Sequence, residues 1–251
     1  MDIQLTQKRV KNCTVIAKDA KKIFDTYWMI NNTTKSLPNL KSLQTTINKE
    51  NPLKLILGIQ LTDVYISASP KILNPNGRTN DIDAHLSVLN SANEFIYICI
   101  QTYAPMFIYT PKYSFWPLIE NALKRALIDR NVTIRFISSS APTFNNTITF
   151  LRSLNALSKL HGTGSIEVRL MTALNKTGII FDYQHDLHDK FIVTDKHALI
   201  ATSNWQADYF SQDTGISFVA YCPQKGKNIR TDLVKLFERN WNSNYTFSVK
   251  N

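Results

Sequence analysis

Cysteine, acidic side chains and long apolar runs are all scarce in this sequence of 251 residues. The three cysteines, Cys13, Cys99 and Cys222, have no CxxC or other metal-ligand spacing, which makes a zinc site unexpected. The longest apolar runs, such as the one around Leu53–Leu61, stay well short of the roughly 18 residues that a membrane-spanning helix needs. The first residues, Met1–Gln4, lack the apolar segment of a signal peptide. These absences predict a soluble globular chain with no metal centre and no membrane helix.

Basic residues are in excess, with 29 Lys and Arg against 19 Asp and Glu, a formal net charge of +10. The excess favours polyanionic partners such as nucleic acid, anionic lipid surfaces or phosphorylated substrates. A lysine-rich surface without such a partner would give the same charge. Asn-x-Ser/Thr sequons permit a secretory-pathway protein without establishing one, and they begin at Asn12, Asn31, Asn32, Asn131, Asn145, Asn175 and Asn244.

Hydrophobic periodicity predicts alternating strands and helices. Strands are expected at 54–69, 94–101, 132–138, 165–171, 190–193, 198–201 and 216–221, and helices at 19–28, 81–92, 115–129, 147–160 and 231–240. The apolar run Glu94–Gln101 is typical of a strand buried on both faces, with Cys99 as a small buried hydrophobic residue. We therefore expect an α/β fold with a mixed, largely parallel central sheet flanked by helices.

An internal repeat connects the two ends of the chain. The segments Asp19–Trp28 and Asp232–Trp241 both read Asp-x-x-Lys-aliphatic-Phe-acid-x-x-Trp, so residue types match at six of ten positions. Chance similarity between two amphipathic helices is the alternative to duplication. The shared terminal Trp at identical spacing favours duplication, and it indicates that the end of one structural unit occurs twice.

The sharpest pattern in the sequence is His-x-Lys-x4-Asp, formed by His188, Lys190 and Asp195. Residues i and i+2 of a strand face the same side, so His188 and Lys190 are expected to share one site. A neutral imidazole is a good nucleophile toward phosphorus. Lys190 and Asn204 would hold the phosphate oxygens and offset the charge of the transition state, while a carboxylate in the site would orient the imidazole. This chemistry suits phosphodiester cleavage with no metal and no other cofactor.

With Ser203-Asn204 behind it, this pattern resembles the HKD signature of the phospholipase D superfamily. Further segments resemble the lumenal branch that contains phospholipase D family members 3 and 4 and poxvirus relatives: Gly77–Asp81, Phe115–Ile119, Thr202–Trp205 and Tyr209-Phe210. The resemblance implies a two-lobed protein in which two pseudo-symmetric HKD lobes form one active site. It also implies a phosphodiesterase that works through a phospho-histidine, with one histidine as nucleophile and the other as proton donor and later base.

Carried over residue by residue, the resemblance assigns roles to seven positions. Catalysis falls to His188, Lys190 and Asp195, phosphate binding to Asn204 and Ser203, and possible substrate contact to Trp205 and Tyr209. A core position is an equal alternative for the two aromatic residues. One departure from the family is mild, since its usual Gly-Ser-x-Asn appears here as Ala201–Asn204.

The serious departure is that no second His-x-Lys exists, because His85, His161, His185 and His197 each lack a lysine two positions later. The segment Met1–Gln7 also resembles what the family has directly after its first HKD motif. We therefore expect residues 1–50 to be the tail of a first, missing lobe with a connector, and residues 51–251 to be the second lobe. On this interpretation Met1 is an internal methionine.

Three hypotheses follow for the chain as a whole. It is the C-terminal half of a two-HKD phosphodiesterase, a single-HKD enzyme completed by a homodimer mate as in some bacterial nucleases, or a non-catalytic phosphate-binding protein. The expected substrate is single-stranded nucleic acid cut as by a 5′-exonuclease, with phospholipid hydrolysis or transphosphatidylation as the alternative. By family analogy the parent protein is expected to be a lumenal glycoprotein of the endoplasmic reticulum or lysosome.

Overall fold

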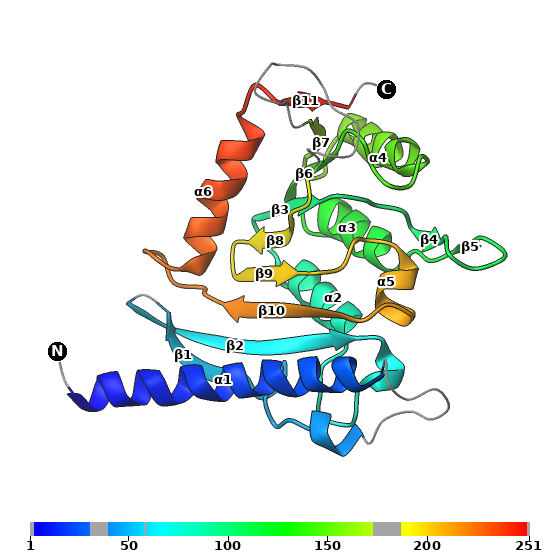
Figure 1. The fold of residues 1–251 in the computed structure, drawn as a ribbon. Helices are drawn as coiled ribbons and strands as arrows, with labels where there is room; N and C mark the ends of the chain where they lie inside the picture. The colour runs from blue at the N-terminus through cyan, green and yellow to red at the C-terminus, as the bar shows by residue number, and fades with distance from the viewer. Residues whose placement is uncertain (1–2, 31–39, 58, 173–186, 250–251) are drawn as a thin grey trace, which may run out of the picture.

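The structure, a computed structural model, describes residues 3–30, 40–57, 59–172 and 187–249. One large sheet with helices on both faces forms the body of the described part (Figure 1). Across the sheet, nine strands of these residues lie in the order β1 (Leu53–Leu57), β2 (Gln60–Ser69), β10 (Gly215–Tyr221), β9 (His197–Ala201), β8 (Lys190–Thr194), β3 (Phe95–Ile100), β6 (Thr133–Ser139), β7 (Ile166–Met171) and β11 (Thr246–Ser248). A separate hairpin of β4 (Met106–Phe107) and β5 (Ser114–Phe115) projects beyond the sheet.

Two helical layers enclose the sheet. Helices α2 (Asp81–Ser91), α3 (Leu118–Asp129) and α4 (Thr147–Ala156) pack on one face. On the other face α1 (Ile3–Ile30) lies along β1 and β2, and α6 (Ile229–Trp241) packs on β3, β8 and β9 (Figure 1). The shorter elements are η1 (Leu40–Leu43), η2 (Lys71–Leu73), η3 (Leu157–Lys159) and α5 (Ala207–Ser211). Within the described ranges, no helix has both the length and the apolar character needed to cross a membrane.

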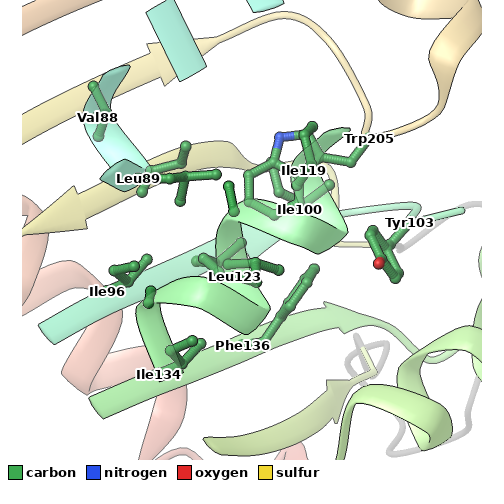
Figure 2. Packing of buried hydrophobic residues seen from close by; sticks show 14 of the residues in the cluster. Val88, Leu89, Ile96, Ile100, Tyr103, Ile119, Leu123, Ile134, Phe136 and Trp205 are labelled. Atoms are coloured by element: carbon green, nitrogen blue, oxygen red, sulfur yellow. The ribbon is translucent and has the colours of Figure 1, made fainter. Parts of the chain in front are cut away.

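The central strand β3 contributes to both hydrophobic layers, as its apolar run predicted. Ile96 and Ile100 pack with the side chains of α2 and α3 (Figure 2), whereas Cys99 belongs to the cluster under α6. The alternation follows from the pleat of a strand, whose successive side chains point to opposite faces. Burial raises the pKa of Cys99 well above its ordinary value, so the thiol stays protonated and serves as a small hydrophobic group.

The sheet is mixed, as expected, but the expectation of a largely parallel sheet is wrong. Among the described strands only the β3–β6 and β6–β7 pairs are parallel, and the remaining neighbours pair in antiparallel fashion. A parallel pair needs a crossover of a dozen or more residues. Strands β8 and β9 are separated by Asp195 and Lys196 alone, so they can only form a hairpin.

The observed ends of several strands and helices differ from the predicted ones. The single strand expected at 54–69 is the antiparallel pair β1 and β2. The helix expected from Phe115 begins at Leu118, and Phe115 belongs to β5. Pro117 explains the delay, because the residue before a proline is driven out of the helical region and Trp116 cannot continue a helix. The first helix, expected at 19–28, spans Ile3–Ile30.

Helix α1 is bound to the sheet by both apolar and charged contacts. Ile23 is buried in a cluster with Leu43 and the β2 side chains Ile66 and Ala68. The Asp19 carboxylate accepts hydrogen bonds from the Arg78 guanidinium at 2.8 and 3.1 Å, and this ion pair is almost completely buried. Arg78 lies in the segment 77–81, so part of that segment serves to fasten α1.

The two copies of the internal repeat have the same ring geometry and opposite exposure. In α6 the Phe237 and Trp241 rings stack with centroids 5.5 Å apart and are 0% and 3% exposed. In α1 the corresponding Phe24 and Trp28 rings stack at 5.9 Å and are 62% and 68% exposed. One copy therefore covers a sheet, and the other presents the same pair of rings to solvent.

Candidate active site

The HKD segment lies where several strand ends meet. Lys190, the first residue of β8, pairs with Ile100, the last residue of β3, because the two strands are antiparallel. The parallel neighbour β6 ends at the same edge, and β9 returns to it with the segment 202–205 after its last residue. Segments far apart in sequence are thereby collected at one edge of the sheet.

Lys190 is the first residue of β8, and His188 lies two residues before the strand. His188 is exposed, while the Lys190 side chain is buried and its Nζ donates to the backbone oxygen of His188 at 3.0 Å. The same Nζ donates to Oε1 of Gln101 at 3.3 Å. A buried ammonium group needs such acceptors because loss of water is costly. The Lys190 charge is thus held against the backbone of the exposed His188.

Asn204 joins Lys190 through Gln101. The Asn204 Nδ2 atom donates to Gln101 Oε1 at 3.3 Å and to the hydroxyl oxygen of Tyr209 at 3.2 Å, and its Oδ1 accepts from the backbone N–H of Thr102 at 3.2 Å. The structure therefore brings Lys190, Asn204 and Tyr209 together, and we call these three with Gln101 the phosphate-site cluster. The sequence argument missed Gln101. The sequence feature that could have indicated it is that Gln101 is a polar residue directly after the apolar run at 95–100.

Ser203 does not face the phosphate-site cluster. Its hydroxyl donates to Asp81 Oδ2 at 3.2 Å, and Ser67 donates to Asp81 Oδ1 at 2.8 Å. Asp81 is the first residue of α2, where the helix dipole stabilises a buried carboxylate. The predicted role of Ser203 as a phosphate ligand is corrected by this contact. Ser203 instead anchors the segment whose next residue is Asn204.

Asp195 lies at the wrong end of β8 for a role beside His188. Its Oδ1 accepts from the backbone N–H groups of Asn93 and Glu94 at 3.0 and 3.3 Å, just before β3. Asp195 follows Lys190 by five residues along β8, a separation of about 16 Å at ~3.3 Å per residue. The expectation that this carboxylate orients the catalytic imidazole is therefore overturned, and Asp195 fixes the start of β3.

Trp205 is a core residue rather than a substrate contact. Its side chain is 1% exposed and packs among Tyr103 and Phe136, in the layer covered by α2 and α3 (Figure 2). Its backbone N–H donates to Thr102 O at 3.0 Å and thereby holds the segment after β9 against the end of β3. Tyr209, by contrast, is half-buried, and its hydroxyl belongs to the phosphate-site cluster.

The cluster has the chemistry of an anion site beside a nucleophile. It combines a fixed ammonium group with neutral amide and phenol groups, and an exposed histidine lies two residues before Lys190. Ammonium and amide N–H donors suit the non-bridging oxygens of a phosphate. Among the described residues, His, Cys, Asp and Glu side chains form no group of three or more that could hold a metal ion.

Comparison with known proteins identifies the family. The family model described as "PLD3/4, PLD-like domain" matches residues 5–176. The chain is 35% identical over 250 residues to the 5′-3′ exonuclease PLD3 of Xenopus tropicalis, covering 94% of this chain and 49% of that protein. It is also 35% identical over 251 residues to the human 5′-3′ exonuclease PLD4, with coverage of 96% and 49%. The chain thus spans about half the length of these curated relatives.

The fold agrees with a solved member of the wider family. Nuc, a phospholipase D family member from Salmonella typhimurium, superposes with a TM-score of 0.53 at 16% identity, covering 76% of this chain and 99% of that chain. At this identity the match concerns the fold. The family model, the curated relatives and the fold agree, and the chain belongs to the phospholipase D family, in the branch of the PLD3/4 PLD-like domain.

Proposed function

We propose that this chain supplies one half of the active site of a phosphodiesterase, with His188 as its nucleophile. The observation that carries the proposal is that Lys190 and Asn204 share the Gln101 side chain, while the Lys190 ammonium also binds the backbone oxygen of the exposed His188. An imidazole nitrogen of His188 attacks phosphorus, and a P–N bond forms as the P–O bond to the leaving group breaks. Lys190 and Asn204 hold the oxygens whose negative charge grows during this step.

The leaving oxygen takes a proton from a second group, and water then attacks the phosphorus of the phospho-histidine, so that the P–N bond breaks, a phosphomonoester is released and His188 is restored. No other histidine of this chain has a lysine two positions later. We propose that the second group comes from another lobe of the same fold, and that residues 1–50 belong with that lobe while residues 51–251 form the second one. The exposed Phe24–Trp28 pair on α1 supports this division, because its counterpart in α6 is covered by a sheet.

Single-stranded nucleic acid is the proposed substrate. The curated relatives are named 5′-3′ exonucleases, and the net charge of +10 suits a polyanion. A phospholipid would satisfy the phosphate-site cluster equally, so the assay below includes one. Two competing interpretations are that a second copy of this chain completes the site and that the chain only binds phosphate. The same assay distinguishes both from the proposal.

The test uses the purified 251-residue chain, with its mass determined by sedimentation and its activity measured on an oligonucleotide with a free 5′ end and on phosphatidylcholine vesicles. We expect a monomer that binds the oligonucleotide and turns it over only when a partner lobe is supplied, for example the unmatched half of Xenopus tropicalis PLD3. His188→Ala should abolish that turnover, and His161→Ala, an exposed histidine in the loop before β7, should not. An active homodimer would replace the second-lobe proposal. Turnover that survives His188→Ala would refute the nucleophile.

We also propose that the parent protein is a lumenal glycoprotein. Three sequon asparagines of the described residues, Asn131, Asn145 and Asn244, are exposed and so open to modification. Secretory expression followed by glycosidase digestion should give a mobility shift, reduced when the three are changed to Gln. No shift would contradict this proposal.

A further inference from the structure

The β4–β5 hairpin carries three exposed aromatic rings. Tyr109, Tyr113 and Phe115 are 59%, 57% and 73% exposed. Scattered exposed apolar side chains are ordinary, but a group of them on one protruding element marks a binding surface. Figure 1 shows the hairpin projecting from the molecule beside α5. We call these three side chains the hairpin rings.

The hairpin is fixed in place by the buried carboxylate of Asp208 in α5. One carboxylate oxygen accepts from the backbone N–H of Ile108 at 2.7 Å and the other accepts from that of Tyr109 at 3.4 Å. At the hairpin base, the backbone N–H of Ala104 donates to Trp205 O at 2.9 Å. The hairpin is therefore attached to the two segments that also carry Asn204 and Tyr209.

Two chains of contacts lead from the phosphate-site cluster to the hairpin rings. The first chain runs through Tyr209, whose hydroxyl oxygen accepts from Asn204 and which neighbours Tyr109. Partial burial raises the pKa of Tyr109, and the nearby Tyr209 raises it further. On the other side, Thr102, whose backbone N–H binds Asn204, has its hydroxyl 3.2 Å from that of Thr143.

The residue after Thr143, Phe144, meets Tyr113 edge to face with ring centroids 6.2 Å apart. The rings are thus continuous with the site proposed to hold a phosphate.

We infer that the hairpin rings stack on bases of the single strand whose phosphate lies at the phosphate-site cluster. The inference rests on the proposed function and adds how the strand is held beyond the reacting phosphate. Aromatic side chains beside a cationic groove are the usual platform for single strands, since every base has a π-face. Residues 106–118 contain no Asp or Glu and one Lys, so the hairpin does not repel a polyanion. Tyr rings also tolerate water on one side, as an open platform requires.

The test compares two labelled strands of equal length and charge, one of thymidines and one of abasic residues, by fluorescence anisotropy at fixed salt. All proteins carry His188→Ala to prevent turnover. We expect the unmodified hairpin to bind the base-bearing strand at least tenfold more tightly. Tyr113→Ala and Phe115→Ala should each reduce that preference by roughly five- to tenfold. Phe115→Trp should preserve it, because a larger ring still stacks. Phe247→Ala is the matched control, an exposed phenylalanine on β11, and should leave the preference unchanged.

Equal affinity for the two strands, or the same small effect of Phe115→Ala and Phe247→Ala, would overturn the inference. Binding to neither strand would overturn it as well. Loss of binding to anionic vesicles in the hairpin variants, with the base preference intact, would assign the rings to a membrane surface instead. These readouts measure binding and do not depend on cleavage. Failure of the phosphodiesterase proposal would show instead in the turnover assay, which uses the protein with His188 intact.

Discussion

Replacement of Gln101 by glutamate tests the electrostatics of the phosphate-site cluster most directly. The change is nearly isosteric and keeps an acceptor oxygen 3.3 Å from both Lys190 Nζ and Asn204 Nδ2. It introduces a negative charge at a place where the structure uses a neutral amide. The hydrogen bonds are retained while the ability of Lys190 to attract a phosphate is reduced.

The size of the effect follows from the geometry. A phosphate held on the far side of the Lys190 ammonium would lie about 6 Å from the new carboxylate, and at an effective dielectric constant of about 20 the repulsion is about 3 kcal/mol. A loss of this size weakens binding by about 100-fold. Gln101→Ala removes the acceptor without adding charge and should cost about tenfold or less, the value of one or two ordinary hydrogen bonds.

The assay is oligonucleotide binding by fluorescence anisotropy, with thermal unfolding as a check on folding. Gln44→Glu is the matched control, because this exposed glutamine makes the same change in net charge beside η1 rather than beside Lys190. The expected order of weakening is Gln101→Glu, then Gln101→Ala, then Gln44→Glu. Equal weakening by the two glutamate variants would refute the reasoning, since only the net charge would then matter.

Other residues give predictions about stability rather than about the site. Asp195→Ala should lower the free energy of unfolding by about 1–3 kcal/mol, because two backbone N–H groups lose their hydrogen-bond acceptor. Oligonucleotide affinity should stay unchanged, and a large loss of affinity would place Asp195 in the site after all. Arg78→Met leaves the buried carboxylate of Asp19 unpaired and should lower the free energy of unfolding in urea by about 3–5 kcal/mol. The double variant with Asp19→Leu should recover part of that loss, and strictly additive losses would contradict a direct pair. Burial, and then the neighbouring Lys196, lower the pKa of His197 to about 4 from 6.5. The unfolded chain therefore takes up this proton first as the pH falls, and stability declines between pH 6.5 and 4 by at most on the order of 3 kcal/mol. His197→Phe should flatten that decline in denaturation curves, and an unchanged slope would rule His197 out as its source.

The local parts of the fold were predictable because they depend on nearby residues. The helix at 81–92 and the strand at 132–138 were expected within one residue of their observed ends, since apolar spacing and an N-terminal turn define them. The short strands around the HKD segment were likewise found. Sheet order was not, because pairings such as β2 with β10 join segments that share no local signal.

The site was predictable only in part for the same reason. The sequence pattern contains His188, Lys190 and Asn204, but it does not say at which end of β8 each side chain lies. Asp195 is part of the motif and yet lies at the opposite end of β8, whereas Gln101 is outside the motif and yet connects Lys190 to Asn204. Residues that are close in the motif lie far apart in space when an extended strand runs between them.

The pairing of β2 with β10 has a consequence for synthesis on the ribosome. Ser69 pairs with Gly215, so the partner of that residue is added 146 positions later (215 − 69). At roughly 5–20 residues per second, the nascent chain carries β2 with that edge unpaired for about 7 to 30 s. During this interval β3, β6 and β7 emerge in spatial order and can assemble. The β2 edge is therefore the segment of the growing chain that a chaperone would most usefully shield from strand-to-strand aggregation.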